Sequence, residues 1–322
     1  MNKQFFEQKQ RIICRLKEAS VPEEQCEIIA DVMNTADLYG VKSHGSSILD
    51  SHLQRIRRNS YNLNPEFRLI TETPSFAVID GDNSIGFVSA NYCMEYAVAK
   101  AKDVGIYMTF SRNNNTCGPA FYYPMKAAEQ GFIGIISTNS PAQMPPSGGR
   151  DKMLGTNPFA AVIPVPGHDP IIIDMSTSVV AKSKFKQYKE LGEQLPDGWA
   201  LDNMGNPTNN PDEGIRGLVL PMAGYKGYCI AMLIDIISGL LSGAAYLNKV
   251  GRFYSEKSAC MNVGFLCIAI DPQKVLGDEY SIAINDYVKT IRNSTVISGK
   301  QITLPGDHRI MNYKNNTTMS DK

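Results

Sequence analysis

The stretch AAEQGFIGIIST, residues 127–138, decides the fold class of this chain. Its first half continues a helical pattern that starts near residue 120 and is expected to end at Gly131, because glycine is favoured just after a helix. Its second half, from residue 132, is apolar enough for a strand buried on both faces. Helices and strands alternate around it, which predicts an α/β layer with at least partly parallel pairing. Further strands are predicted at 67–71, 75–80, 106–110, 159–164, 170–174 and 260–270.

The rest of the chain is predicted to form further helices, one long loop and a polar tail. The segment 185–215 is polar and rich in turn-forming residues, so it is expected to be a loop. From residue 312 the tail is polar and is expected to fray. The apolar stretch 227–246 has about the length of a membrane span, but it contains Asp235 and three glycines. It is therefore predicted to be a helix in the core or in a subunit interface. Other helices are predicted at 5–19, 23–40, 46–57, 91–102 and 278–292.

Composition excludes several classes of protein. The 322 residues carry 32 basic and 32 acidic side chains, and this zero net charge indicates no general surface for nucleic acid or an anionic membrane. The apolar content of 43% supports a sizeable core, organised as two domains or as one α/β unit with an appendage. The seven cysteines are scattered and form no Cys-x-x-Cys pair, and the first residues do not resemble a signal peptide. Both features favour a cytoplasmic protein.

Familiar catalytic and nucleotide-binding motifs are absent from the sequence. No Gly-x-Gly-x-x-Gly follows a predicted strand and no Walker motif occurs, so ordinary Rossmann and P-loop sites are not predicted. The lack of His-Glu-x-x-His and Gly-x-Ser-x-Gly argues against a histidine metal site and a hydrolase. Small polar clusters lie instead at predicted strand ends, at 137–149, 154–159 and 174–178. Each cluster alone is typical of a turn, but the three together favour a phosphate-bearing ligand.

The run Ser43-His44-Gly45 holds the best candidate for proton transfer. The chain has only four histidines, and imidazole titrates closest to neutral pH. His44 lies at a predicted helix–helix junction, between a small hydroxyl residue and a glycine, where a ligand can approach closely. The alternative is an ordinary helix-ending turn. A catalytic pair of Ser43 with His44 is not expected, because adjacent side chains seldom point at one another.

Eight runs, spread in order over almost the whole chain, resemble the malate/L-lactate dehydrogenase family of non-Rossmann oxidoreductases. That family includes ureidoglycolate, sulfolactate and diketogulonate enzymes and reductases of cyclic imino acids. The runs are ADLYGVKSHG (36–45), AAEQGFIGI (127–135), TNSPAQMPPSGG (138–149), LGTNPFA (154–160), IIIDMSTSVVAKSK (171–184), PDGWALDNMGNPT (196–208), GYKGY (224–228) and LPGD (304–307).

The resemblance implies a homodimer with an α/β fold like that of L-sulfolactate dehydrogenase. A mixed-sheet domain, 73–267, would bind NADH or NADPH through its loops, and a helical region, 1–72, would pack with the C-terminal segments 268–322. No metal, nucleic acid or membrane is implied. Lys226 would neutralise a phosphate of the cofactor. The implied cofactor contacts are Ser140, Thr156, Asn157, Asp174, Met175, Ser176, Tyr225, Lys226, Pro305, Gly306 and Asp307.

The implied chemistry is reversible hydride transfer between nicotinamide and a carbonyl or imine carbon, with His44 as general acid and base. The substrate would contact Ser43, Ile48, His52 and Thr116. Three of these positions depart from the family pattern. Ile48 stands where related enzymes have an arginine that clamps a carboxylate, and His52 where some have tyrosine. Thr116 stands where the family's Asn-His-x-Gly pattern has its histidine, and the next residue, Cys117, is expected to be a small buried thiol.

These departures favour a small polar substrate other than a standard α-keto acid. A conventional 2-hydroxy acid dehydrogenase remains open, with the carboxylate held by another arginine. A cofactor-binding protein that has lost catalysis also remains open, because of Thr116. The sequence does not choose between NADH and NADPH, although Arg150 and Lys152 could grip a 2′-phosphate. The alternative carboxylate-binding arginines are Arg55, Arg57, Arg58 and Arg112.

Overall fold

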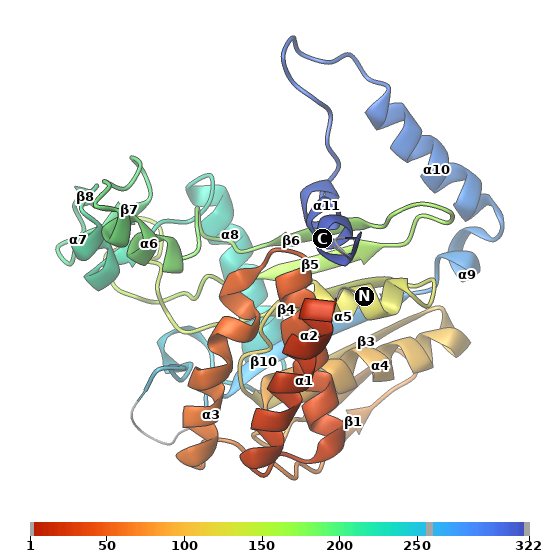
Figure 1. Ribbon diagram of the computed structural model, residues 1–322, viewed down its shortest axis with the longest axis horizontal. Coiled ribbons are helices and arrows are strands. Elements are labelled where there is room, and N and C mark those ends of the chain that lie inside the picture. Colours follow the sequence, from red (N-terminus) through yellow and green to blue (C-terminus); the bar gives the residue numbers. More distant parts are fainter. Residues whose placement is uncertain (1–2, 256–259, 319–322) are drawn as a thin grey trace.

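The computed structural model describes residues 3–255 and 260–318. Its centre is a seven-stranded mixed sheet with the strand order β1-β2-β3-β10-β4-β5-β6 (Figure 1). Within the described residues, β2 and β3 form the one parallel pair of this sheet, and the other neighbours are antiparallel. The predicted α/β class is confirmed. The strands are β1 (Arg68–Glu72), β2 (Phe76–Asp80), β3 (Ile106–Asn114), β4 (Ile133–Thr138), β5 (Phe159–Ile163), β6 (Ile171–Met175) and β10 (Val263–Ile270).

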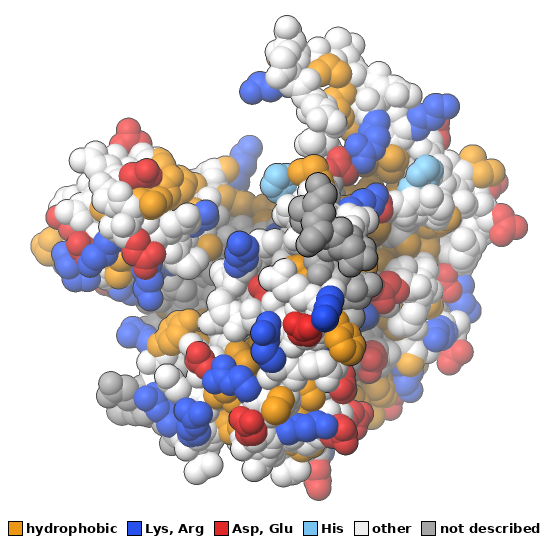
Figure 2. All heavy atoms as spheres, in the orientation of Figure 1, with side chains coloured by type: hydrophobic (Ala, Val, Ile, Leu, Met, Phe, Trp, Pro, Cys, Tyr) orange, Lys and Arg blue, Asp and Glu red, His pale blue; other side chains and the backbone are white. Residues whose placement is uncertain are grey.

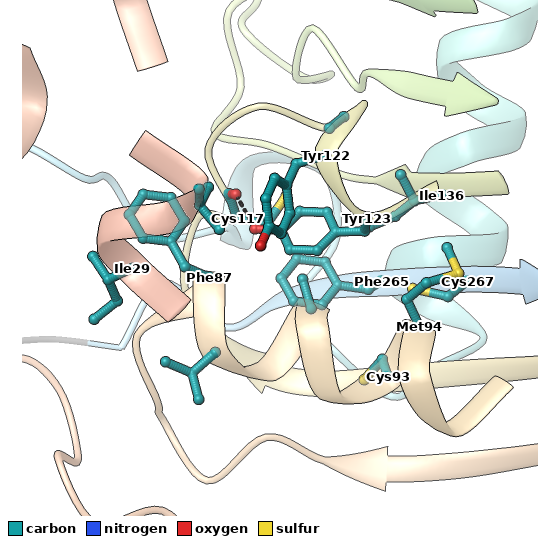
Figure 3. Close-up of a cluster of buried hydrophobic side chains, with 14 of the residues drawn as sticks. Ile29, Phe87, Cys93, Met94, Cys117, Tyr122, Tyr123, Ile136, Phe265 and Cys267 are labelled. Atoms are coloured by element: carbon teal, nitrogen blue, oxygen red, sulfur yellow. Dashed lines mark hydrogen bonds between the residues drawn. The ribbon is translucent and has the colours of Figure 1, made fainter. Parts of the chain in front are cut away.

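Helices cover both faces of the sheet. Gly134 of β4 lies against Pro124 of α5 (Tyr122–Ala128), where a Cβ would come within 2.7 Å of the Pro124 backbone. Ser137, on the alternate face of the same strand, hydrogen-bonds Ser238 at 2.7 Å. Ser238 belongs to the π-helix η3 (Asp235–Leu240), which continues α8 (Tyr225–Ile234). The α5 face also carries α4 (Gly86–Val104), and Figure 3 shows Phe87 and Met94 packed with Tyr123, Ile136 and Phe265.

The helical N-terminal region consists of α1 (Lys3–Glu18), α2 (Glu23–Leu38) and α3 (Leu49–Arg57), with η1 (Lys42–His44) and η2 (Ser46–Ile48) before α3. The C-terminal helix α11 (Asp307–Thr318) packs against α2. Tyr39 stacks on Tyr313 at 4.8 Å, and the Asn316 amide donates to the Leu38 carbonyl at 2.9 Å. The prediction of a frayed tail was wrong for residues 312–318, because these contacts hold the last helix, and residues 319–322 lie outside the described part of the chain. The sheet includes residues 68–72, which were assigned to the helical N-terminal region, and residues 268–270, which were assigned to the C-terminal segments. The sheet therefore crosses both predicted domain boundaries.

Residues 183–219 form a small lobe that projects from the main body (Figures 1 and 2). It contains a three-stranded sheet of order β8-β7-β9 and its own buried cluster around Phe185, Leu195 and Val219. The prediction of a loop here was wrong, since two-residue strands are too short to show periodicity. Its elements are α6 (Ser183–Leu191), β7 (Ala200–Leu201), β8 (Pro207–Thr208), α7 (Pro211–Arg216) and β9 (Leu218–Val219).

Three more helices complete the described chain: η4 (Leu247–Lys249), α9 (Pro272–Leu276) and α10 (Glu279–Arg292). Figure 1 shows α10 extending away from the sheet. Within the described residues, no helix has both the length and the hydropathy to cross a membrane.

Candidate active site

The loop that carries His44 is built on Asp37, in the last turn of α2. The Asp37 carboxylate accepts hydrogen bonds from the Ser46 backbone N–H at 2.9 Å and from the Gln8 side chain. Gly45 packs directly against this carboxylate, because a Cβ added to Gly45 would lie 1.9 Å from Asp37 Oδ1. The glycine in Ser43-His44-Gly45 is therefore required by close approach, and it presents His44 between the two short helices η1 and η2.

His44 is half-buried and its Nδ1 lies 2.9 Å from the Ser43 hydroxyl. The expectation that these neighbouring side chains would diverge was wrong, because the 3₁₀ geometry of η1 brings them together. Burial, and then the charge of Arg309, lower the pKa of His44. The ring is thus neutral at pH 7. With Nδ1 held by Ser43, Nε2 is the nitrogen left to exchange a proton with a substrate.

Arg309 is a residue of this site that the sequence reasoning missed. It lies on α11, and its guanidinium is 2.9 Å from Asp174 Oδ2 and 5.1 Å above the ring of Phe121. It also donates to the backbone carbonyl of Asp174 at 3.3 Å. Burial raises the pKa of Asp174 although Arg309 acts in the opposite direction. The only sequence signal was that Arg309 follows the predicted cofactor loop at 305–307 by two residues.

The predicted substrate contacts divide into two groups. Ser43 is exposed, and Ile48 and Thr116 are partly exposed. His52 is in the core, 1% exposed, with Nδ1 3.0 Å from the Tyr61 hydroxyl. Burial and the neighbouring charge of Arg55 lower its pKa to about 3. The prediction that His52 contacts substrate was wrong, because the inward face of α3 carries it into the aromatic core.

The structure also places Cys117 and the four arginines that were considered as alternative carboxylate-binding residues. Cys117 is buried, as predicted, and burial raises its pKa to about 12; Figure 3 shows its carbonyl bonded to the Tyr123 hydroxyl. Arg55 is 3% exposed and donates to the Phe253 carbonyl and to Asn115. Arg112 pairs with Asp80. The exposed Arg57 and Arg58 lie at the end of α3 opposite to His44. None of these four arginines joins the His44 loop.

Three of the predicted cofactor residues form one hydrogen-bonded group at the ends of β4 and β5. The Ser140 N–H donates to Asn157 Oδ1 at 3.0 Å, and its hydroxyl lies 3.5 Å from that of Thr156. Asn157 is fully buried and its amide donates to the Ala231 carbonyl of α8. It therefore orients Ser140, while Ser140 and Thr156 remain partly exposed.

The end of β6 joins this group to the C-terminal loop. The Thr177 N–H donates to the Thr156 carbonyl at 2.9 Å, and the Ile172 N–H donates to the Pro305 carbonyl at 3.0 Å. Gly306 has φ +96° and lies against Ile172, so a side chain would be excluded there. Asp307 is held by Arg292 at 2.8 and 2.9 Å. Met175 is exposed, and the Ser176 hydroxyl lies 3.1 Å from that of Ser178.

The N-terminus of α8 lies beside the same group, since the Met222 N–H donates to the Thr177 carbonyl at 2.9 Å. Tyr225 and Lys226 are exposed in the first turn of this helix. A cavity of about 370 Å³ is lined by Gly224 and Tyr225 at the start of this helix, and Pro145–Gly149 form one wall. Free helix N–H groups, a lysine and small hydroxyl residues suit a dinucleotide phosphate. The residues present therefore fit a nicotinamide dinucleotide.

Comparison with known proteins gives the family of this chain. The family model for malate/L-lactate dehydrogenase matches residues 5–319. The chain belongs to that family. Malate dehydrogenase of Pyrococcus horikoshii is 39% identical over 292 residues, 88% of this chain and 80% of the relative. Ureidoglycolate dehydrogenase (NAD(+)) of Escherichia coli is 35% identical over 80% of this chain and 73% of the relative. The structure of sulfolactate dehydrogenase from Methanocaldococcus jannaschii superposes with a TM-score of 0.91 at 35% identity, covering 97% of this chain and 90% of that one.

The family assignment makes the chain an NAD(P)-dependent dehydrogenase acting on a small molecule. Within the described residues, no group of three or more His, Cys, Asp or Glu side chains is placed to hold a metal ion.

Proposed function

We propose that this enzyme transfers a hydride reversibly between NAD(P)H and the C=O or C=N group of a small polar metabolite, with His44 as general acid and base. The observation that supports it best is the position of His44. Its ring is neutral, its Nδ1 is held by Ser43, and the charge of Arg309, which pairs with Asp174 of the predicted cofactor loop, acts on it.

The chain's own residues have distinct tasks in this reaction. When bound, the nicotinamide supplies or accepts the hydride. Ser140, Thr156, Ser176 and the N-terminus of α8 with Lys226 would hold the dinucleotide. In the oxidation direction, the neutral His44 takes the proton from the substrate's hydroxyl or amine group. In the reduction direction, protonated His44 returns that proton to the oxygen or nitrogen.

Replacing His44 tests this proposal. His44→Ala is expected to lower kcat by roughly 10²–10⁴-fold, the usual contribution of a positioned histidine, and to leave the Kd for NADH unchanged. His168→Gln is the matched control, because His168 is exposed in the β5–β6 turn, at the opposite end of these strands from the Thr156 and Met175 loops. Equal activity of the His44→Ala and His168→Gln variants would exclude the role of His44. Tight cofactor binding without turnover by the native enzyme over a broad substrate panel would indicate the catalytically silent alternative.

A second candidate is a conventional 2-hydroxy acid dehydrogenase, and Arg309 specifically favours it. Ile48 removes one carboxylate clamp, but the Arg309 side chain is 26% exposed and its positive charge acts on His44, so Arg309 can bind a substrate carboxylate. Activity with malate, lactate or ureidoglycolate whose KM rises at least tenfold in Arg309→Met, but much less in Arg309→Lys, would establish this candidate. Turnover confined to substrates other than 2-hydroxy or 2-oxo acids would establish the first.

We also propose a cytoplasmic homodimer. The outward face of α8 and η3 exposes Leu233, Ile236, Leu240 and Leu241, an apolar strip that a second copy would cover. All seven cysteines are free, which suits a reducing compartment. Light scattering of the purified chain measures the assembly, and Ile236→Glu combined with Leu240→Glu is expected to yield monomers. A native chain that is monomeric at micromolar concentration would contradict the homodimer.

A further inference from the structure

Two lysines from distant parts of the chain meet at the start of β9. Lys152 Nζ donates to the Arg216 carbonyl at 2.7 Å, and Lys182 Nζ donates to the Gly217 carbonyl at 2.9 Å. The two carbonyls belong to consecutive residues, so both ammonium groups are held along the same short stretch of backbone, and the charge of Lys152 acts on Lys182. Each ammonium has three N–H donors and uses one on its carbonyl, which leaves the others for a ligand.

Arg252 adds a third positive charge from the loop that follows η4. Burial first, and then the charge of Arg252, lower the pKa of Lys152. Burial first, and then the charges of Lys152 and Arg252, lower the pKa of Lys182 to about 8. Across residues 3–255 and 260–318, none of the three forms an ion pair with an aspartate or glutamate. We call Lys152, Lys182 and Arg252 the basic site.

The position of the basic site also suits an anion. Lys182 immediately precedes α6, a nine-residue helix that begins at Ser183, so the positive end of the helix dipole adds to the three charges. Lys152 and Lys182 bind carbonyls of the small lobe, whereas Arg252 is next to Phe253, which packs on His52 of the main body. Figure 2 shows Lys and Arg side chains on both sides of the junction between the lobe and the body.

The geometry points to a binding site for a phosphate monoester dianion between the small lobe and the loop at Arg252. Like charges that converge without a carboxylate repel one another, and a doubly charged oxyanion removes that repulsion. Both lysines are already oriented by their carbonyls, so little side-chain freedom is lost when the oxyanion binds. This inference rests on the proposed function, because both sources of the phosphate are ligands of the proposed reaction. One is the 2′-phosphate of NADPH, and the other is a phosphorylated substrate.

Direct binding to the full chain tests the site. Trp199 is the one tryptophan of the sequence and packs edge-to-face with Tyr188 of α6, with ring centroids 5.4 Å apart, so its fluorescence reports on this lobe. Inorganic phosphate, NADPH and NADH are titrated into the native enzyme, into Lys152→Met/Lys182→Met and into Lys186→Met. Lys186 is an exposed lysine of the same helix and serves as the control. Equal melting temperatures of the three proteins ensure that folding is not the cause of any difference.

We expect the phosphate Kd to rise roughly tenfold or more for each lysine removed, since each loses a charge-assisted hydrogen bond. If NADPH is the source, its Kd rises with that of phosphate while the NADH Kd is unchanged. If the substrate is the source, phosphate binding weakens and both cofactors bind as before. Native-like phosphate binding in the double variant would overturn the site. Failure of the native enzyme to bind NADH would instead contradict the proposed function. Failure of the basic site and failure of the proposed function therefore give different results.

Discussion

Substituting Gly45 by alanine is expected to destabilise the enzyme through one carboxylate. The new Cβ would lie 1.9 Å from Asp37 Oδ1 and 2.4 Å from its Cγ, so the Asp37 side chain must move. Movement breaks its hydrogen bonds with the Ser46 N–H and the Gln8 amide. Each hydrogen bond to a charged group contributes about 1.5–3 kcal/mol. Asp37 is partly exposed, so water replaces part of the lost hydrogen bonding. We therefore expect the lower end of this range for each of the two bonds, a loss of about 3 kcal/mol in the free energy of unfolding. Backbone strain does not contribute, since φ of Gly45 is −91°.

The assay is thermal unfolding of four proteins: native, Gly45→Ala, Asp37→Ala and the double variant. In the Asp37→Ala background the clash is absent, so adding Gly45→Ala is expected to change stability by less than about 1 kcal/mol. The coupling energy of the cycle is then about 2 kcal/mol. Gly45→Ala should also lower kcat more than it raises the Kd for NADH, because His44 precedes it directly. An equal cost of Gly45→Ala in both backgrounds would refute the reasoning.

Two further predictions concern buried titratable groups. The pKa of His52 is about 3 in the folded chain and near 6.5 when unfolded, so the unfolded state binds an extra proton between these values. Stability is therefore complete above pH 6.5 and falls by about 1.4 kcal/mol per pH unit below it. His52→Phe should flatten this acid limb and keep turnover, whereas His168→Gln should leave the limb unchanged; an unaltered limb in His52→Phe contradicts the assignment. Iodoacetamide at pH 8 should modify the exposed Cys14 and Cys229 and spare Cys117, and mass spectrometry of peptides detects any exception.

Local sequence patterns predicted much of the fold because their information lies within a few residues. The helix that ends before Gly131 and the strand that follows it are found as α5 and β4, since apolar periodicity and a terminating glycine act over one or two turns. The small lobe was missed because its strands have two residues each and its core draws on Met144 and Ala231 from outside the segment. The strand order was also beyond the sequence, because β10 inserts between β3 and β4.

The candidate site divides in the same way. The sequence by itself indicated the His44 loop and the small polar strand ends, because each depends on residue type over a short span. The space expected for a ligand at Gly45 is instead filled by the Asp37 carboxylate. Only the tertiary structure decided that the charge of Arg309 acts on His44 and that His52 is in the core. It also decided that Lys152 and Lys182 bind consecutive carbonyls, where the charge of Arg252 acts on both. These residues come together through α11, the inward face of α3 and the small lobe. Their proximity results from packing between segments far apart in the chain, which no local pattern encodes.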